Sequence, residues 1–336
     1  MATRRHVLRF LAAVSALAIS AAAHAFDIGL PLDCTPGVDC WVLNYVDVDP
    51  GPGTRDGACG ARSYDGHDGT DFAIRDLAAM AKGVAVRAAA PGTVKAVRDG
   101  MRDVAVSAIG RDAVKGQECG NGVVIEHGQG WETQYCHMRQ GSIAVRRGDR
   151  VAEGQTLGLV GLSGMTEFPH VHLTVRRAGK ALDPFTGRAQ DGVCGSAGAA
   201  PLWRTEAKLR YEPVVLFNAG VSAGPPAIDA LRSGAARVSA LPPDAPALVL
   251  WFEAFGVKNG DAVSFRLVAP DGRTVFDTSR TLVVGSTEQR AYQMLYAGER
   301  RGASPWPAGS YRGSVTLTRN DSPPIESRIE TSVEVR

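Results

Sequence analysis

The sequence lacks three patterns that would point to other kinds of site or fold. It has no CxxC pair, in which two residues separate two cysteines, no HExxH motif and no long amphipathic helical pattern. The first absence argues against a thiolate zinc site, and the second excludes a thermolysin-like site with a glutamate base. An excess of one charge is also missing. The net charge is +2, and removing the three arginines of the acid-free first 25 residues leaves −1. No basic field therefore remains to attract nucleic acid.

The first 25 residues have the three-part organisation of an export signal. Arg4, Arg5 and Arg9 precede an alanine-rich apolar stretch at 10–23, and small residues at positions 23 and 25 form a cleavage site. The apolar stretch is shorter than the roughly 20 residues that a membrane-spanning helix needs. We therefore expect a cleaved signal peptide at 1–25 and export by the general secretory or twin-arginine route. The mature chain would be periplasmic or secreted, without an integral membrane segment.

An even number of cysteines in an exported chain favours disulfide bonds. The sequence has six, all in its first two thirds. Two pairs are favoured, because one spans a short Pro-Gly turn and the other flanks a predicted hairpin. The third pair follows only by elimination. In that order, the pairs are Cys34–Cys40, Cys119–Cys136 and Cys59–Cys194.

Short β-rich runs separated by glycine-containing turns predict an all-β or β-dominated fold. Residues 127–130 are typical of a tight hairpin turn, and residues 102–118 of an inserted loop or short helix. Residues 26–62, which are rich in Gly, Pro and Asp, are expected to form an extended lead-in pinned by disulfides. The predicted strands are Val84–Arg87, Gly92–Val97, Val123–Glu126, Glu132–Cys136, Thr156–Val160 and Val171–Val175.

The C-terminal part of the chain has a different character. From about Tyr211 onwards it contains neither cysteine nor histidine. Residues 263–267 and 311–317 alternate with the period of two that is typical of half-buried strands, and Asp-Gly and Pro-Ala-Gly turns lie between such runs. This pattern favours an immunoglobulin-like β-sandwich over residues 211–336.

Four histidines lie in two short patterns and one isolated position. An HDGTD stretch places His67 and Asp71 four residues apart, and imidazole with carboxylate is a donor set that suits zinc. In an HVH stretch, His170 and His172 share one face of a predicted strand, so one ring can ligate a metal while the other faces the same cavity. His137 ends another predicted strand and gains significance only from these neighbours.

These motifs carry a resemblance to a known family. HDGTDF, YCHM and PHVHL resemble, in order and spacing, the lysostaphin-type (β-lytic) zinc metallopeptidases that cut peptidoglycan cross-links. The resemblance runs from about Ser63 to Pro184. It implies a mostly antiparallel β domain with an open groove at residues 63–200, holding one Zn²⁺ per chain.

The resemblance also implies roles for five residues. His67, Asp71 and His172 would be zinc ligands, and His137 and His170 the catalytic pair. Two neutral imidazoles and one carboxylate leave a fourth position for water, whose pKa a bound zinc ion lowers. One of the two catalytic histidines would take the proton of that water, and the other would stabilise the oxyanion. The sequence leaves open which does which.

Other residues near the motifs are expected to play smaller parts. Asp65 and Asp68 could orient a ligand imidazole, although surface turn positions are the favoured interpretation. His127, in the hairpin turn, matches no catalytic position. Phe168 departs from the small residues that the family usually has ahead of its HxH motif, and we expect it to narrow or reshape a subsite.

The leading hypothesis is an exported endopeptidase that hydrolyses the stem-peptide cross-links of peptidoglycan. One alternative is a secreted protease that acts on glycine-rich proteins. Another is a non-catalytic wall-binding or amidase-activating module, which the five intact positions disfavour. The C-terminal sandwich could bind glycan, dock an unknown partner, regulate access to the groove or serve as a spacer.

Overall fold

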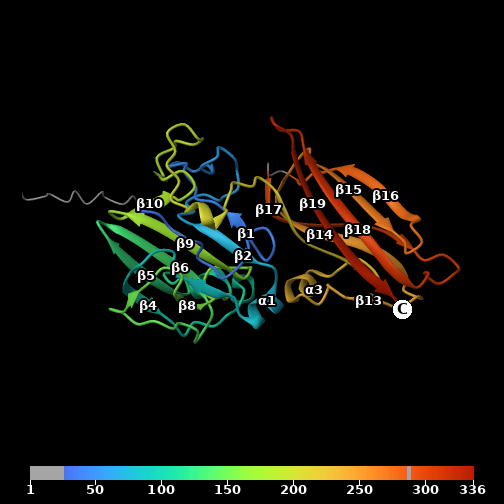
Figure 1. Cartoon of the computed structure of the whole chain (residues 1–336), viewed down its shortest axis with the longest axis horizontal. Helices are drawn as coiled ribbons and strands as arrows, with labels where there is room; N and C mark the ends of the chain where they lie inside the picture. Colours follow the sequence, from blue (N-terminus) through green and yellow to red (C-terminus); the bar gives the residue numbers. More distant parts are fainter. Residues whose placement is uncertain (1–25, 286–288) are drawn as a thin grey trace, which may run out of the picture.

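The structure, a computed structural model, describes residues 26–285 and 289–336. The expected signal peptide at 1–25 lies outside the described residues. The described chain forms two β-rich parts that lie side by side (Figure 1), which confirms the predicted β-dominated fold class. Within the described ranges, no helix is both long enough and apolar enough to cross a membrane.

A nine-stranded antiparallel sheet organises the first part. Its central strand β9 lies between β2 and β6, and all but its last two residues are buried. Because side chains alternate across a strand, Val171, Leu173 and Val175 enter the hydrophobic core while His170 and His172 face the other side. Along the sheet, the strands are β1 Cys40–Asn44, β2 Thr70–Ile74, β9 His170–Arg177, β6 Trp131–Met138, β5 Asn121–Gly128, β4 Gly92–Arg98 and β7 Arg150–Val151, with β10 Lys180–Asp183 and β11 Arg188–Ala189 beside β9.

Each of the six strands predicted in this part corresponds to an observed strand. Two of them, β3 Ala85–Arg87 and β8 Thr156–Leu159, pair separately from the main sheet. The turn at 127–130 joins β5 to β6, as expected. The segment 102–118 contains helix α2 Val106–Ile109 and the 3-10 turn η1 Arg111–Val114.

The segment 26–62 is more than an extended lead-in. Its strand β1 pairs with β2, and its residues Tyr45 and Val46 are almost wholly buried. The prediction missed this strand because Gly, Pro and Asp surround it and obscure a short apolar run. Three further short helical segments complete the first part and the start of the second: α1 Leu77–Lys82, η2 Thr205–Ala207 and α3 Ile228–Ser233.

The second part is a sandwich of two sheets whose inner faces share one hydrophobic core. Counted in chain order, the first, second and fifth long strands of this part form one sheet. The third, fourth, sixth and seventh form the other, an arrangement typical of immunoglobulin-like folds. One sheet contains β12 Val215–Ser222, β14 Ala247–Lys258 and β17 Gln289–Arg300. The other contains β13 Ala240–Leu241, β19 Ile325–Val335, β18 Gly309–Arg319, β15 Ala262–Val268 and β16 Thr274–Thr281.

All three expected disulfide bonds are present. The bonds Cys34–Cys40 and Cys119–Cys136 link residues 6 and 17 positions apart. Cys59–Cys194 spans 135 positions and ties the N-terminal segment to the chain that leaves the nine-stranded sheet. A cross-link that closes a longer loop removes more conformational entropy from the unfolded chain.

We therefore expect unequal losses when these bonds are removed. The Cys59→Ser/Cys194→Ser variant should lose about 5 kcal/mol of unfolding free energy, and the Cys34→Ser/Cys40→Ser variant only about 2 kcal/mol, by the loop-entropy relation. Urea denaturation of both variants beside the wild type measures the difference. Equal losses would contradict the assignment of the longer bond as the main cross-link.

Candidate metal centre

The pairing of β2 with β9 places two of the expected ligands opposite each other. In the register of this antiparallel pair, Asp71 lies across from His172, and Ala73 across from His170. His67 comes from the turn just before β2. Gly69 of that turn approaches so closely that a Cβ atom there would lie 2.4 Å from Nε2 of His172. The turn can therefore fold onto the ligand only with glycine at this position.

Three donor atoms from these residues converge. Nε2 of His67 lies 3.1 Å from Oδ1 of Asp71 and 3.0 Å from Nδ1 of His172, and the last two atoms are 2.9 Å apart. All three residues are buried. Atoms bound at about 2.0–2.1 Å to one tetrahedral ion lie about 3.3 Å from each other. The triangle and its donor chemistry, two imidazoles and a carboxylate, therefore fit a zinc ion, and this group could hold a metal ion.

Hydrogen bonds fix which atom of each donor faces the centre. Nδ1 of His67 donates to the carbonyl of Tyr45 at 2.7 Å, which leaves Nε2 as the free acceptor. Nδ2 of Asn44 donates to Oδ2 of Asp71 at 2.8 Å and leaves Oδ1 for the centre. Although burial alone would raise it, the nearby His67 and His170 hold the pKa of Asp71 well below its usual range.

His172 is oriented in the opposite sense from His67. Its Nε2 lies 3.2 Å from Oδ1 of Asp68 and 3.0 Å from Oγ1 of Thr174, so Nδ1 faces the other donors. Burial opposes the ionised form of Asp68, but His172 and Arg176 lower the pKa of this carboxyl to about 2. Asp68 is therefore an acceptor that orients a ligand ring. The favoured expectation of a simple surface turn residue was wrong for Asp68.

His137 and His170 lie side by side next to the triangle, with ring centroids 4.7 Å apart. Nδ1 of His137 donates to the carbonyl of Ser163 at 2.8 Å, and Nδ1 of His170 donates to the carbonyl of Phe168 at 2.7 Å. Each ring therefore has Nε2 free for chemistry, and that of His170 lies 3.5 Å from Oδ1 of Asp71. Burial, with the neighbouring His170 and His172, holds the pKa of His137 well below 6.5 and keeps its ring neutral.

An unusual backbone conformation aims His137 at the site. Its φ of 60° lies in the left-handed region, which non-glycine residues rarely adopt. The adjacent disulfide Cys119–Cys136 and a hydrogen bond from the amide of His137 to the carbonyl of Cys119, at 2.8 Å, hold this end of β6. The nearby scaffold thus maintains a strained position where a functional side chain lies.

Asp71, His137 and His170 line an open cleft of about 720 Å³, and His67 and His172 lie behind Asp71, in contact with it. Tyr64, Arg111 and the segment 165–168 form its rim, together with His137 and His170. Phe168 does line this cleft, as expected, but its ring is half-buried and packs against the sandwich. His127 lies outside the cluster, where it bonds the carbonyl of Pro91 and the hydroxyl of Thr133.

The sequence did not reveal several groups that orient the five site residues. Thr174 continues the period-two pattern after the HVH stretch, so that alternation could have identified it. Asn44 carried no signal, because it belongs to a strand 27 residues before Asp71. Ser163 and Phe168 act through main-chain carbonyls, which any residue type offers.

Residues 65–184 match the family model described as Peptidase family M23. This part of the chain is therefore an M23 peptidase domain, and the resemblance to lysostaphin-type metallopeptidases is confirmed. An uncharacterized metalloprotease of Haemophilus influenzae is 28% identical over 133 residues, 40% of this chain and 23% of that protein.

Two further relatives have more specific names. The peptidoglycan DD-endopeptidase ShyA of Vibrio cholerae is 43% identical over 53 residues, 16% of this chain and 12% of that protein. The murein hydrolase activator EnvC of Escherichia coli is 34% identical over 103 residues, 31% of this chain and 22% of that protein. The chain thus spans less than a quarter of the length of each of these relatives.

Asn44 supports a direct prediction about metal affinity. An Asn44→Ala variant should bind zinc about 10–100-fold more weakly, because loss of a partner that orients a ligand typically has this effect. Competition with a fluorescent chelator measures the affinity, and Asn259→Ala, on the distant sandwich, serves as the control. Unchanged affinity in Asn44→Ala would contradict the role of Asp71 as an oriented ligand.

Proposed function

We propose that this chain is an exported zinc metalloendopeptidase that hydrolyses the stem-peptide cross-links of peptidoglycan. The observation that carries the proposal is the convergence of His67, Asp71 and His172 at one point, next to an open cleft that Asp71, His137 and His170 line. We also propose one zinc ion per chain, held by the first three residues. Export through a cleaved signal at 1–25 and a periplasmic or secreted location belong to the same proposal.

A bound zinc ion would supply Lewis acidity, which polarises a carbonyl and makes water a stronger acid near neutral pH. The protein contributes two imidazoles next to that point, each oriented by a carbonyl that accepts its Nδ1–H. One of His137 and His170 accepts the proton of the attacking water through Nε2. The other, in its form that also carries a proton on Nε2, donates a hydrogen bond from this nitrogen to the oxygen of the scissile carbonyl as charge develops there. Both rings have the same tautomer, so single variants are needed to assign the two roles.

The choice of peptidoglycan rests on the named relatives and on the cleft. The Vibrio relative is a peptidoglycan DD-endopeptidase, and His137 and His170 line an open cleft. Under this proposal the chain has three parts after the signal: a disulfide-pinned segment at 26–62, the peptidase domain at 63–200 and a sandwich at 211–336.

One observation favours a second candidate function, a non-catalytic activator of other murein hydrolases. The Escherichia coli relative, which matches over 103 residues, carries that name. An activator needs neither a metal triangle nor a pair of oriented imidazoles. Because both are assembled here, we favour the enzyme.

The decisive experiment compares single-histidine variants on purified sacculi. His137→Ala and His170→Ala should keep zinc but lower the rate of cross-link cleavage about 10²–10⁴-fold, as expected when a general acid or base is removed. His172→Ala should lose both zinc and activity. Metal analysis and muropeptide chromatography measure the two properties separately.

His127→Ala is the matched control, because it removes a histidine of the same sheet that lies outside the cluster. It should cleave at the wild-type rate. If the zinc-loaded wild-type chain releases no cross-links but stimulates an amidase, the activator candidate replaces the enzyme. If a glycine-rich protein is cut and sacculi are not, the substrate class is wrong.

A further inference from the structure

Phe168 joins the active-site loop to the C-terminal sandwich. It lies two residues before His170, and its ring packs edge-on against Phe217 of β12 and Phe255 of β14. Both ring-centroid distances are 5.9 Å, with interplanar angles of 83° and 89°. Phe217 and Phe255 are themselves stacked at 4.1 Å, and each is no more than 2% exposed. Phe217 and Phe255 of the sandwich thus form an aromatic clamp around Phe168, near the end of the loop before β9.

The main chain of Phe168 holds the catalytic ring. Its carbonyl accepts the Nδ1–H of His170 at 2.7 Å and the hydroxyl of Thr166 at 2.9 Å. That hydroxyl in turn lies 3.1 Å from Nδ1 of His170. Any shift of Phe168 therefore moves the acceptor that sets the tautomer and the orientation of His170.

The same aromatic cluster reaches the metal triangle from a second side. Trp41 of β1 contacts Phe217, with centroids 5.6 Å apart. Asn44, at the end of the same strand, holds Asp71. Ala73, two residues after Asp71 on β2, is wholly buried in this cluster. The sandwich therefore supports both the strand that carries a ligand and the loop before a catalytic histidine.

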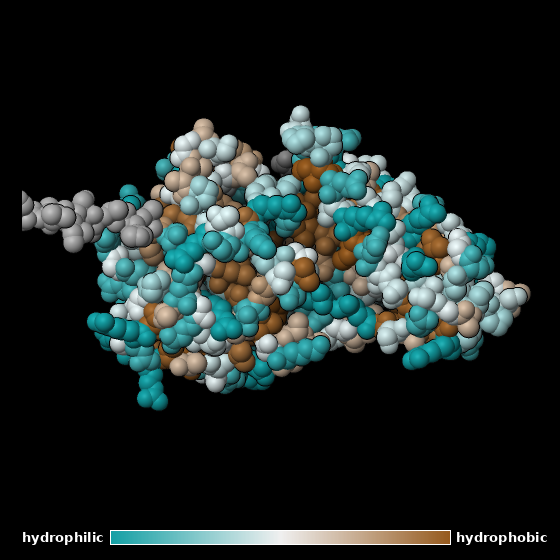
Figure 2. Space-filling model, viewed as in Figure 1, coloured by the Kyte–Doolittle hydropathy of each residue, from teal (hydrophilic) through white to brown (hydrophobic). Residues whose placement is uncertain are grey.

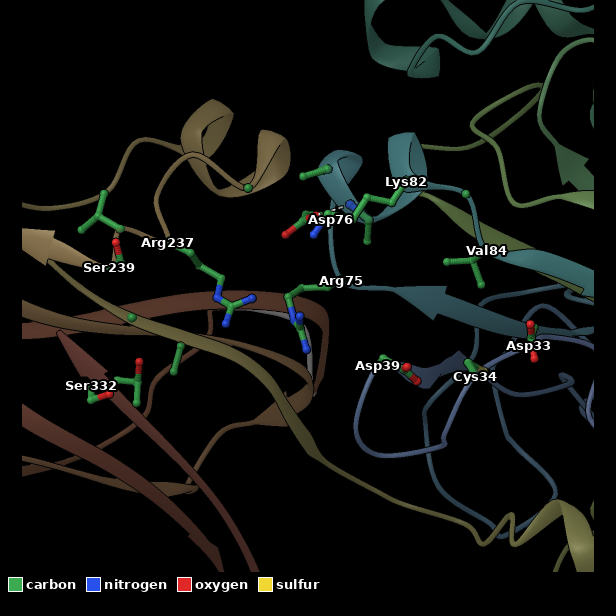
Figure 3. A pocket seen from close by; sticks show the side chains of 18 residues that line it. Asp33, Cys34, Asp39, Arg75, Asp76, Lys82, Val84, Arg237, Ser239 and Ser332 are labelled. Atoms are coloured by element: carbon green, nitrogen blue, oxygen red, sulfur yellow. Dashed lines mark hydrogen bonds between the residues drawn. The ribbon is translucent and has the colours of Figure 1, made fainter.

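This packing is concentrated near the active site. Figure 2 shows hydrophobic residues gathered where the two parts meet. Elsewhere the boundary contains a cleft of about 750 Å³, into which Arg75 and Arg237 project (Figure 3), and beside this cleft α1 contacts α3. A simple spacer would not need a cluster of buried aromatic rings beside His170.

We propose that the C-terminal sandwich is a positioning element for the active site, in which Phe217 and Phe255 clamp Phe168 and so fix the carbonyl that orients His170. The inference rests on the proposed function for its catalytic readout. Phe217 lies outside the lining of the cleft, so its effect on catalysis would pass through the loop.

The test uses the full mature chain loaded with zinc. Phe217→Ala should lower kcat for cross-link cleavage about tenfold or more, because small misplacements of a catalytic group are costly. KM and zinc content should stay near the wild-type values. Phe217→Leu, which keeps an apolar side chain at this position, should recover part of kcat.

Phe265→Ala is the matched control for general loss of stability. This ring is also buried in the sandwich, but it packs against Phe252 in the core between the two sheets. It should lower the unfolding temperature and leave kcat unchanged. A double-variant cycle sharpens the result: Phe168→Ala/Phe217→Ala should lose no more kcat than Phe168→Ala alone, since both remove one contact.

Hydrogen exchange gives a readout that does not depend on activity. In Phe217→Ala, the amides of residues 165–168 should exchange faster than in the wild type and in Phe265→Ala. Unchanged exchange and unchanged kcat in Phe217→Ala would overturn the inference, as would equal kcat losses in Phe217→Ala and Phe265→Ala. An inactive wild type whose Phe217→Ala variant still loses protection would reject the proposed function but keep the clamp.

Discussion

The antiparallel pairing of β2 with β9 is the contact on which the metal centre depends. It brings Asp71 opposite His172 although 101 positions separate them in the sequence. Both strands are buried, so a shift of register by one residue would turn Phe72 and Val171 out of the core and the ligands into it. The hydrophobic pattern that folds the sheet therefore also fixes the distance between the donor atoms.

Main-chain carbonyls determine which ring nitrogen of His67, His137 and His170 faces the site. An imidazole has two nitrogens, and a carbonyl can only accept, so each carbonyl contact determines which nitrogen stays free. Tyr45 supplies one of these carbonyls from the segment after β1, and Ser163 and Phe168 supply the other two from the loop between β8 and β9. The chemistry of the cleft therefore depends on the backbone path of segments whose side chains carry no catalytic signal.

That dependence explains what the sequence could and could not predict. The spacing of His170 and His172 predicted a shared strand face, and the family motifs predicted which histidines would meet. The contact of Asn44 with Asp71 could not be predicted, because only the β1–β2 pairing, with its irregular register near Asn44, brings the two residues together. The contact of Asp68 with His172 was considered from the sequence but not favoured, since an Asp-Gly turn is normally exposed.

Strand β14 shows why the sandwich was the hardest part to interpret. Its residues from Leu248 to Val257 are all buried, although a sandwich strand normally has one face towards solvent. The even-numbered residues Leu250 and Phe252 fill the sandwich core, while Phe255 packs against the peptidase sheet. Such a strand shows no alternation to detect. Its continuous apolar run is itself the mark of a second buried face, which here adjoins the loop that carries His170.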